Sequence, residues 1–299
     1  MTDFIVERII PITLETTSPL TEMYTLSPFV WREHGHYGLL LRAVNRSANA
    51  AEKVSRIYYG QSDDGARFVM GRDPVIAPGP DPDDHDGCED PTVAVDGGVT
   101  YVYYSGWNGT DGRGQLLLAE GADGAHPRKR GVILPSTDDA RNPKEASIGR
   151  IADGTWRLFF EYAADGASKI GVASAPAVDG PWTVLEPIVV ARPAHWDGWH
   201  LSPGPLLEAD TERPVMFYNG ATRDTKWRIG WIAFDAGFTR VVDRCDDPVI
   251  VPPPPEGDAT DIAFAASAVE LDGTIQLYYS VADKDLMRAT LRRSSLQRQ

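Results

Sequence analysis

The residues best suited to acid–base chemistry are three carboxylic acids at the ends of short strand-like runs. Asp90 and Glu145 each begin such a run, and Glu161 ends the apolar run from Trp156 to Phe160. A polar residue at the end of an apolar run is unusual in a core strand, but it is common where a strand opens into a polar pocket. Carboxyl groups that face one pocket can act as a general acid and a general base. The sequence therefore predicts a pocket that carries out proton transfer.

The elements that must position these acids recur along the chain in five copies. Each copy has a strand, a short polar turn, a second apolar strand that ends on a polar residue, and a third strand. A repeat of this length built only from strands is typical of a propeller. An antiparallel sandwich also has short strands at regular spacing, but the recurring order of elements favours the propeller. We therefore predict an all-β fold, a five-bladed β-propeller made by residues 1–299 as one catalytic domain.

Equivalent residues of the five copies should meet, because a propeller places the innermost strand of each blade beside a central channel. The first strands begin at Ser27, Asp90, Glu145, Ser202 and a residue near Ala265. The second strands end at Arg42, Ser105, Glu161, Asn219 and Ser280. Glu89 and Asp90 are neighbours on a strand and should face opposite sides, so only one of them can point to the channel.

Composition and charge limit the kinds of partner. The chain has 299 residues, 42% of them hydrophobic, and a formal net charge of −14, which argues against nucleic acid and anionic membranes and favours a neutral ligand. No run approaches the roughly twenty apolar residues that span a bilayer, and the N-terminal sequence lacks a basic segment followed by an apolar one. We therefore expect a cytoplasmic protein without membrane contact.

Cysteines and histidines give no sign of a disulfide framework or a metal site. Cys88 and Cys245 are the only two cysteines, and we expect both to be reduced. The interpretation of Cys88 as a small buried residue at a strand entry is preferred over that of a nucleophile. His195 and His200 have no third ligand near them in the sequence. We expect neither a metal nor a cofactor.

In this register the chain resembles glycoside hydrolase family 130, whose five-bladed propellers hydrolyse or phosphorolyse mannosides. The resemblance covers most of the chain and depends on segments that occur in the family's order. These are Leu39 to Val44, Glu89-Asp90-Pro91, Lys144-Glu145, Phe217 to Gly220 with Trp227 to Gly230, and Asp261 to Phe264 with Leu277 to Ser280. Each segment alone is weak evidence, whereas their shared order is stronger.

The resemblance implies roles for individual residues. Asp90 matches the family's proton donor to the glycosidic oxygen. Arg42 and Asp261 match substrate-binding positions. Arg141-Asn142 matches a pair that contacts phosphate in the phosphorolytic members.

Three positions depart from the family pattern. Thr92 stands where the family often has Arg, Asn219 where the phosphorylase signature has His, and His200 where Lys is expected. A phosphate dianion among carboxylates needs several fixed cationic donors. The departures therefore favour hydrolysis over phosphorolysis.

We predict an inverting glycoside hydrolase that acts on β-mannosides or related oligosaccharides. Asp90 is its predicted general acid, and Glu145 or Glu161 is the base that activates water. Neighbouring carboxylates and partial burial should give Asp90 the raised pKa that an acid needs near neutral pH. The predicted substrate-binding residues are Arg42, Asn45, Ser105, Lys144, His200, Asn219, Asp261 and Asp283, and the candidate phosphate ligands are Arg141 and Asn142.

Several alternatives stay open. The first is an inverting phosphorylase that binds inorganic phosphate through Arg141, Lys144 and His200, and the second is a carbohydrate-binding propeller without catalysis. A third is a five-bladed glycosidase acting on arabinosides or fructosides; Ser27 disfavours it, because that group tends to have an aspartate there. The segment from Phe4 to Thr13 either adds a strand to the last blade or reaches a neighbouring subunit of a homo-oligomer.

Overall fold

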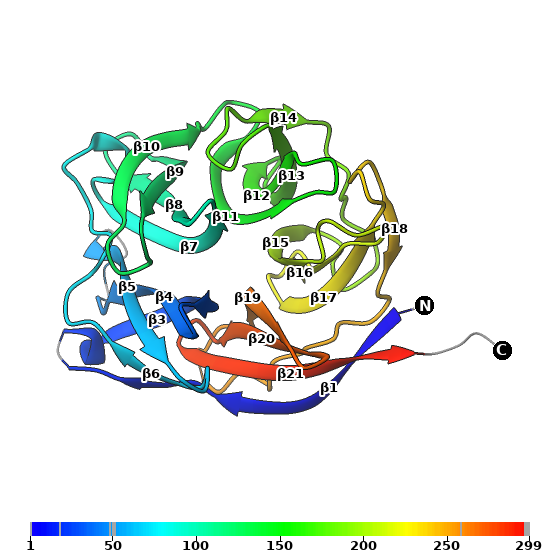
Figure 1. Ribbon diagram of the computed structural model, residues 1–299, viewed down its shortest axis with the longest axis horizontal. Helices are drawn as coiled ribbons and strands as arrows, with labels where there is room; N and C mark the ends of the chain where they lie inside the picture. Colours follow the sequence, from blue (N-terminus) through cyan, green and yellow to red (C-terminus); the bar gives the residue numbers. More distant parts are fainter. Residues whose placement is uncertain (1, 18, 48, 50–51, 258, 296–299) are drawn as a thin grey trace.

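The computed structural model describes residues 2–17, 19–47, 49, 52–257 and 259–295. These residues form five sheets around a central axis (Figure 1), which confirms the predicted all-β fold and the five-bladed β-propeller. The described part of the chain has short 3-10 segments, among them Leu20–Glu22 and Pro82–Asp84, and no α-helix. It has no helix long and apolar enough to cross a membrane.

Each blade has the three strands of the repeat and a fourth outer strand. Blade one contains β3 (Met23–Glu33), β4 (His36–Asn45), β5 (Ser55–Ser62) and β6 (Arg67–Met70). Blade two contains β7 (Gly87–Asp96), β8 (Val99–Asn108), β9 (Arg113–Gly121) and β10 (Arg128–Leu134). Blade three contains β11 (Arg141–Arg150), β12 (Trp156–Ala164), β13 (Ala167–Ala175) and β14 (Thr183–Leu185). Blade four contains β15 (His200–Leu207), β16 (Val215–Ala221), β17 (Trp227–Phe234) and β18 (Val241–Arg244). Blade five contains β19 (Ala263–Leu271), β20 (Thr274–Val281), β21 (Asp285–Ser295) and β1 (Thr2–Pro11).

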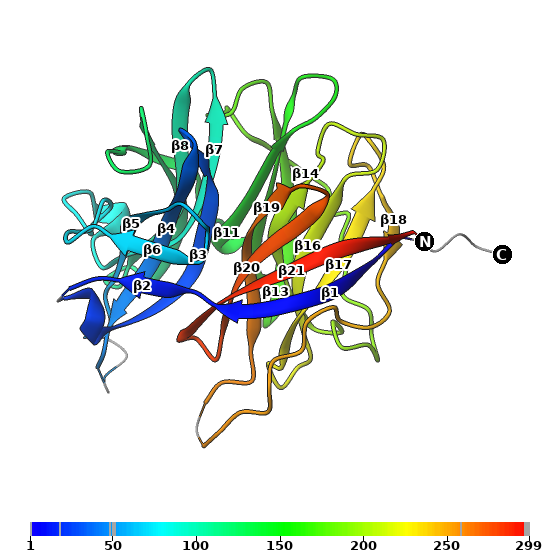
Figure 2. The same ribbon diagram turned by 60° about the horizontal axis from the view of Figure 1, so that its bottom comes forward.

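The N-terminal segment closes the ring. β1 pairs antiparallel with β21, and the short strand β2 (Thr13–Glu15) then pairs parallel with β6 of blade one (Figure 2). Phe4 of β1 is buried, and its ring meets that of Phe217 edge-on at 4.9 Å between centroids. Of the two alternatives for the segment from Phe4, the structure shows the added strand on the last blade. The same segment ties blade five to blade one.

The second strand of each blade lies within the core. All residues of β16 are buried, because neighbouring strands and blades cover both of its faces. Between blades three and four, the ring of Phe159 packs against those of Phe234 and Phe238, with centroids 5.3 and 5.6 Å apart. This burial explains the apolar runs of the second strands. The same packing holds in place the polar residue with which each run ends.

A local irregularity in the innermost strands aims the candidate acids. In β3, β7 and β11 the pairing register with the second strand shifts at Ser27, Asp90 and Glu145. These residues have φ angles of 51°, 49° and 51°, a region that residues other than glycine rarely adopt. Such bulges redirect side chains and occur often beside active sites. The shifts in blades four and five contain Gly204 and Ala266, which carry no ionisable group.

Candidate active site

Asp90 lies at the shift in β7, and its side chain is fully buried. Its Oδ1 accepts hydrogen bonds from Ser27 Oγ and Arg42 Nη1, each at 2.9 Å. Its Oδ2 is buried and has no hydrogen-bond partner among the described residues. Burial alone would raise the pKa of Asp90, but the charges of Arg42 and Lys144 hold it below its ordinary value. Asp90 is therefore ionised, and its Oδ2 is an acceptor with no partner among the described residues.

Glu145 occupies the corresponding position in β11 but has the opposite protonation. Burial and the negative charge of Asp90 raise the pKa of Glu145 well above its ordinary value. Two carboxyl groups that interact this closely titrate as a pair. Because Arg42 and Ser27 stabilise the ionised form of Asp90, the shared proton lies on Glu145. The raised pKa predicted for Asp90 is therefore found on Glu145 instead, and the guanidinium bound to Asp90 is the reason.

Arg42, near the end of β4, joins Asp90 to its neighbour in sequence. Its Nη2 lies 2.9 Å from Glu89 Oε1, while its Nη1 binds Asp90. Both acidic residues thus contact the same guanidinium, although a regular strand would direct them to opposite faces. The register shift and the positive φ at Asp90 break the alternation of a regular strand.

Glu161 lines a hollow of about 310 Å³ between blades two and three, here called the Glu161 hollow. Its Oε1 accepts a hydrogen bond from Ser168 Oγ at 2.8 Å and lies 3.5 Å from Lys144 Nζ. The charge of Glu161 raises the pKa of Lys144, which is therefore cationic. Ser105 and Asn142 also line the hollow. The Oγ of Ser105 is buried without a partner among the described residues, whereas the Oδ1 of Asn142 accepts a backbone hydrogen bond.

A second hollow, of about 570 Å³, is lined by Arg42 and by Asp283 of the β20–β21 turn and is here called the Arg42 hollow. Burial raises the pKa of Asp283 above its ordinary value. Arg42 also pairs with Glu89, which lines the Glu161 hollow. The Arg42–Glu89 ion pair therefore links the two hollows, and Asp90 is bound directly to that pair.

Asn219 does not belong to this site. It is fully buried, and its Nδ2 donates to the carbonyl oxygens of Pro203 and Ala265 at 3.2 and 3.1 Å. Its Oδ1 accepts a hydrogen bond from Ala265 N at 2.7 Å. With these contacts the side chain fastens blade four to blade five. The predicted contact of Asn219 with a sugar hydroxyl is therefore corrected to a structural role.

Asn45, Asp261 and Arg141 also lie outside the two hollows. Asn45 braces the loop after β4 through hydrogen bonds to two backbone groups. Asp261 forms an ion pair with Arg228 at 2.7 Å. Arg141 is exposed and lines a separate hollow of about 530 Å³ that also contains Asp165. The expected phosphate pair is thus divided, because Arg141 and Asn142 line different hollows.

His200 is connected to the site through one residue, Ser168. Its Nδ1 accepts a hydrogen bond from Ser168 N at 3.0 Å, and the Oγ of the same serine donates to Glu161. Its ring stacks on Trp227 at 5.7 Å between centroids. Burial lowers the pKa of His200, which is therefore neutral near pH 7.

Four residues of the site were given no catalytic or binding role from the sequence: Ser27, Ser55, Glu89 and Ser168. The repeat placed Ser27 at the channel, because it aligns with Asp90 and Glu145, but it assigned no chemistry to this serine. Glu89 was set aside because a regular strand would turn only one of the two neighbours inward, and the family resemblance favoured Asp90. Ser55 and Ser168 begin third strands or lie near their starts, and no chemical signal in the sequence distinguishes them from other serines.

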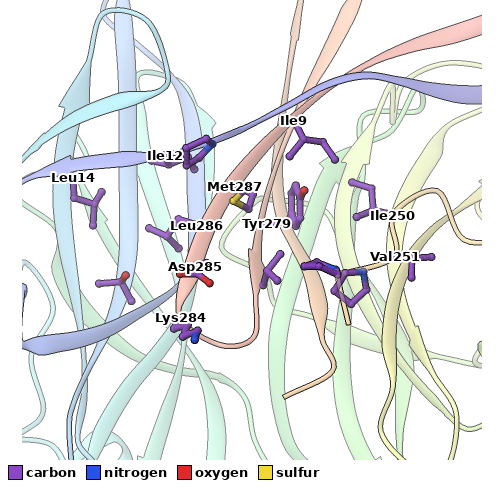
Figure 3. Close-up of a pocket in the computed structure, with 15 residues that line it drawn as sticks. Ile9, Ile12, Leu14, Ile250, Val251, Tyr279, Lys284, Asp285, Leu286 and Met287 are labelled. Carbon is purple, nitrogen blue, oxygen red and sulfur yellow. The ribbon is translucent and has the colours of Figure 1, made fainter. Parts of the chain in front are cut away.

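An apolar hollow of about 470 Å³ lies apart from these acids (Figure 3). Ile9, Ile250, Tyr279 and Met287 line it, between β1, β20 and β21. It contains none of the site's carboxyl groups. Among the described residues, no group of three or more His, Cys, Asp or Glu side chains could hold a metal ion.

Comparison with known proteins gives relatives whose alignments cover most of the chain. No model of a known protein family matches it. A 1,2-β-oligomannan phosphorylase of Thermoanaerobacter sp. (strain X514) is 22% identical over 258 residues, which cover 84% of this chain and 84% of the relative. The solved structure of β-1,2-mannobiose phosphorylase from Listeria innocua in complex with β-1,2-mannobiose has a TM-score of 0.77 at 19% identity, covering 95% of this chain and 90% of that one.

A further solved structure bears the description that the GH130 family of mannoside phosphorylases contains glycoside hydrolases that target β-1,2 mannosidic linkages in Candida mannan. It has a TM-score of 0.76 at 23% identity and covers 90% of this chain and 84% of that one. The resemblance to glycoside hydrolase family 130 is confirmed. The comparisons also bear out the prediction of a glycoside-cleaving enzyme, at the level of glycosidase or phosphorylase. They do not choose between hydrolysis and phosphorolysis, which depends on the chemistry of the site.

Proposed function

We propose that the protein is an inverting glycoside hydrolase of β-mannosides, with β-1,2-linked manno-oligosaccharides as the substrate class that its relatives suggest. The observation that carries the proposal is the charge pattern of the site. An ionised Asp90 lies beside a protonated Glu145, and Glu161 faces the adjoining hollow. Inverting hydrolysis needs one protonated and one ionised carboxyl group on the two sides of the scissile bond.

In this proposal the Asp90–Glu145 pair is the general acid. It gives one proton to the glycosidic oxygen as the bond to the leaving group breaks, and in the free protein that proton is on Glu145. Glu161 is the general base, which takes a proton from water as the water oxygen bonds to the anomeric carbon. Lys144 orients Glu161 through their ion pair. Asp283 lines the Arg42 hollow and is suited to bind sugar hydroxyls.

The cations of the site support water rather than phosphate as the attacking group. Arg42 and Lys144 are each paired with carboxylates of the site. His200 has a lowered pKa and is neutral near pH 7, and Arg141 lines a different hollow. A phosphate dianion would therefore meet several carboxylates without the additional fixed cations that it needs.

Phosphorolysis is the second candidate function, and the relatives favour it. The Thermoanaerobacter protein, whose alignment covers 84% of this chain, is named a phosphorylase. Lys144 and Asn142 line the same hollow as Glu161, where an attacking phosphate would have to sit.

The products distinguish these functions. We expect purified protein to release free mannose from β-1,2-mannobiose at a rate that does not change between 0 and about 10 mM phosphate. Formation of mannose 1-phosphate only when phosphate is added would overturn the hydrolase proposal in favour of a phosphorylase. Ligand-induced thermal stabilisation with no product after long incubation would instead indicate a carbohydrate-binding propeller.

The pH profile tests the acid assignment. Activity needs the protonated form of Glu145, whose pKa is raised by burial and by Asp90. The value of kcat/KM should therefore persist above the ordinary carboxyl range and fall as the pH rises through this raised pKa. An activity that is constant up to pH 10 would contradict the assignment.

We also propose that the protein acts in the cytosol. Both Cys88 and Cys245 are free and buried, which accords with a reducing compartment. Recovery of the native protein in a secreted or envelope fraction of its source cells would contradict this.

A further inference from the structure

The guanidinium of Arg42 is held from one side by two groups that do not belong to the proposed acid pair. Its Nη2 lies 2.9 Å from Glu89 Oε1, and its Nε donates to Ser55 Oγ at 3.2 Å. Ser55 Oγ in turn donates to the same Oε1 of Glu89 at 3.0 Å. The three side chains form a closed set of contacts. Only Nη1 is directed away from this set, and it binds Asp90 at 2.9 Å.

This arrangement depends on the register shift in β7. A regular strand would direct Glu89 and Asp90 to opposite faces. With φ at 49° on Asp90, one guanidinium can reach both neighbours. A non-glycine residue in this conformation is strained. The surrounding contacts therefore hold the two carboxylates together against a backbone preference.

We propose that Glu89 is a positioning residue that, together with Ser55, holds Arg42 against Asp90 and thereby decides which carboxyl group of the site carries the proton. The inference deepens the proposed hydrolase and rests on its acid pair. Without the hold, Arg42 could move away from Asp90. The carboxylate of Asp90 would then lose its main cation, and the proton would no longer be confined to Glu145.

Other charged groups also act on the pair, and each comes from a different element. Lys144 of β11 lowers the pKa values of both Asp90 and Glu145, and Glu161 of β12 raises that of Glu145. Asp283 of the β20–β21 turn, whose own pKa responds to Arg42 and Asp90, is the remaining charged neighbour. None of these groups contacts Ser55 directly among the described residues, so a change at Ser55 acts on the pair through Arg42 and Glu89.

Ser55→Ala is the sharpest variant, because it removes both hydrogen bonds of this hydroxyl without changing any charge. If Ser55 and Glu89 position Arg42, the cation moves off the acid pair, and the pKa that limits kcat/KM at high pH should rise by roughly 0.5–1 unit. Ser174→Ala is the matched control, because Ser174 also accepts from an arginine, Arg157, at 2.7 Å but lies outside the site. It should leave the profile where it is.

Glu89→Gln and Glu89→Asp separate positioning from sugar binding. Removing the charge of Glu89 would by itself lower the pKa of Glu145, since a nearby negative charge is lost. Loss of the hold on Arg42 would raise it. We expect the rise to dominate in Glu89→Gln together with a lower kcat, and we expect Glu89→Asp to restore much of the wild-type profile. An increase in KM alone, with an unshifted profile, would show that Glu89 binds sugar and does not position Arg42.

A measurement that needs no activity keeps this inference separate from the proposed function. In protein labelled with ¹³C at the glutamate carboxyl carbons, the signal that disappears in Glu145→Gln reports the titration of Glu145. Its midpoint should rise in Ser55→Ala and stay fixed in Ser174→Ala. An unmoved midpoint would overturn the positioning role even in an active hydrolase, whereas a shifted midpoint in a protein without hydrolase activity would support the role and reject the reaction.

Discussion

Glu161 of blade three and Asn219 of blade four lie at equivalent positions near the ends of their second strands, yet they do different things. Glu161 has one carboxylate oxygen bound by Ser168 and faces a hollow. Asn219 uses both ends of its amide on backbone groups of Pro203 and Ala265. The same position of the repeat therefore holds a candidate catalytic residue in blade three and a residue that fastens two blades together in blade four. A symmetric scaffold thus places polar groups at equivalent points, while their neighbours decide whether a group remains available.

The largest expected effect follows from removing a carboxylate of the catalytic blades. Asp90→Asn, Glu145→Gln and Glu161→Gln should each lower kcat/KM on β-1,2-mannobiose by about 10²–10⁴-fold, because each removes a proton-transferring group or its charge partner. Steady-state kinetics with circular dichroism as a folding check would measure this. Glu15→Gln is the matched control, since Glu15 pairs with Arg67 on an exposed surface. Full turnover by Asp90→Asn would remove Asp90 from the acid pair.

Replacing Asn219, the structural residue of the two, should lower stability more than activity. Asn219→Ala should lower the free energy of unfolding by about 2–4 kcal/mol, because buried backbone groups lose their partners. It should lower kcat/KM of the folded protein far less than Glu161→Gln does. Urea unfolding gives the stability, with Asn108→Ala as the control, since Asn108 also binds a backbone carbonyl but is only partly buried. A large kinetic loss without a stability loss would return Asn219 to the sugar-binding residues.

Replacing Glu145, in contrast, should lower activity but increase stability as the pH rises. Its pKa is raised in the folded protein, so wild-type stability from this group is complete below the ordinary glutamate pKa and is lost as the pH rises through the folded value. Glu145→Gln cannot ionise, so its stability relative to wild type should increase across that window. Each pH unit by which the pKa is raised corresponds to about 1.4 kcal/mol. Thermal unfolding at pH 4 and pH 9 would measure the gain, and an equal difference at both pH values would contradict it.

The smallest effect is expected at Arg141. Because it is exposed and lines a hollow separate from that of Glu161, Arg141→Ala should change kcat/KM by less than about twofold. Lys144→Ala, on the same strand, should cause a much larger loss because Lys144 pairs with Glu161. Both variants would be assayed with and without phosphate. A loss in Arg141→Ala that appears only with phosphate would favour the phosphorylase.

Much of the site was predictable because the repeat brings equivalent positions together. Asp90, Glu145 and Glu161 could be selected from their places at strand ends, and the structure groups them with Arg42 and Lys144. Asn45 and Asp261 could not be excluded, because their partners come from a loop and from another strand. Glu89 was missed for a different reason. Strand alternation, a sound rule for a regular strand, fails at the bulge that aims Asp90.

The five-bladed architecture is encoded in the amino-acid sequence, since the order of apolar runs and turns recurs and each second strand must be buried on both faces. The sequence also sets which residue types stand near the ends of those strands. Which carboxyl group holds the proton, and which polar side chain is taken up by backbone hydrogen bonds, depends on the folded arrangement. Protonation depends on burial and on the distance to Arg42, and availability depends on backbone groups from the next blade. These are contacts between segments far apart in the chain, and local sequence does not encode them.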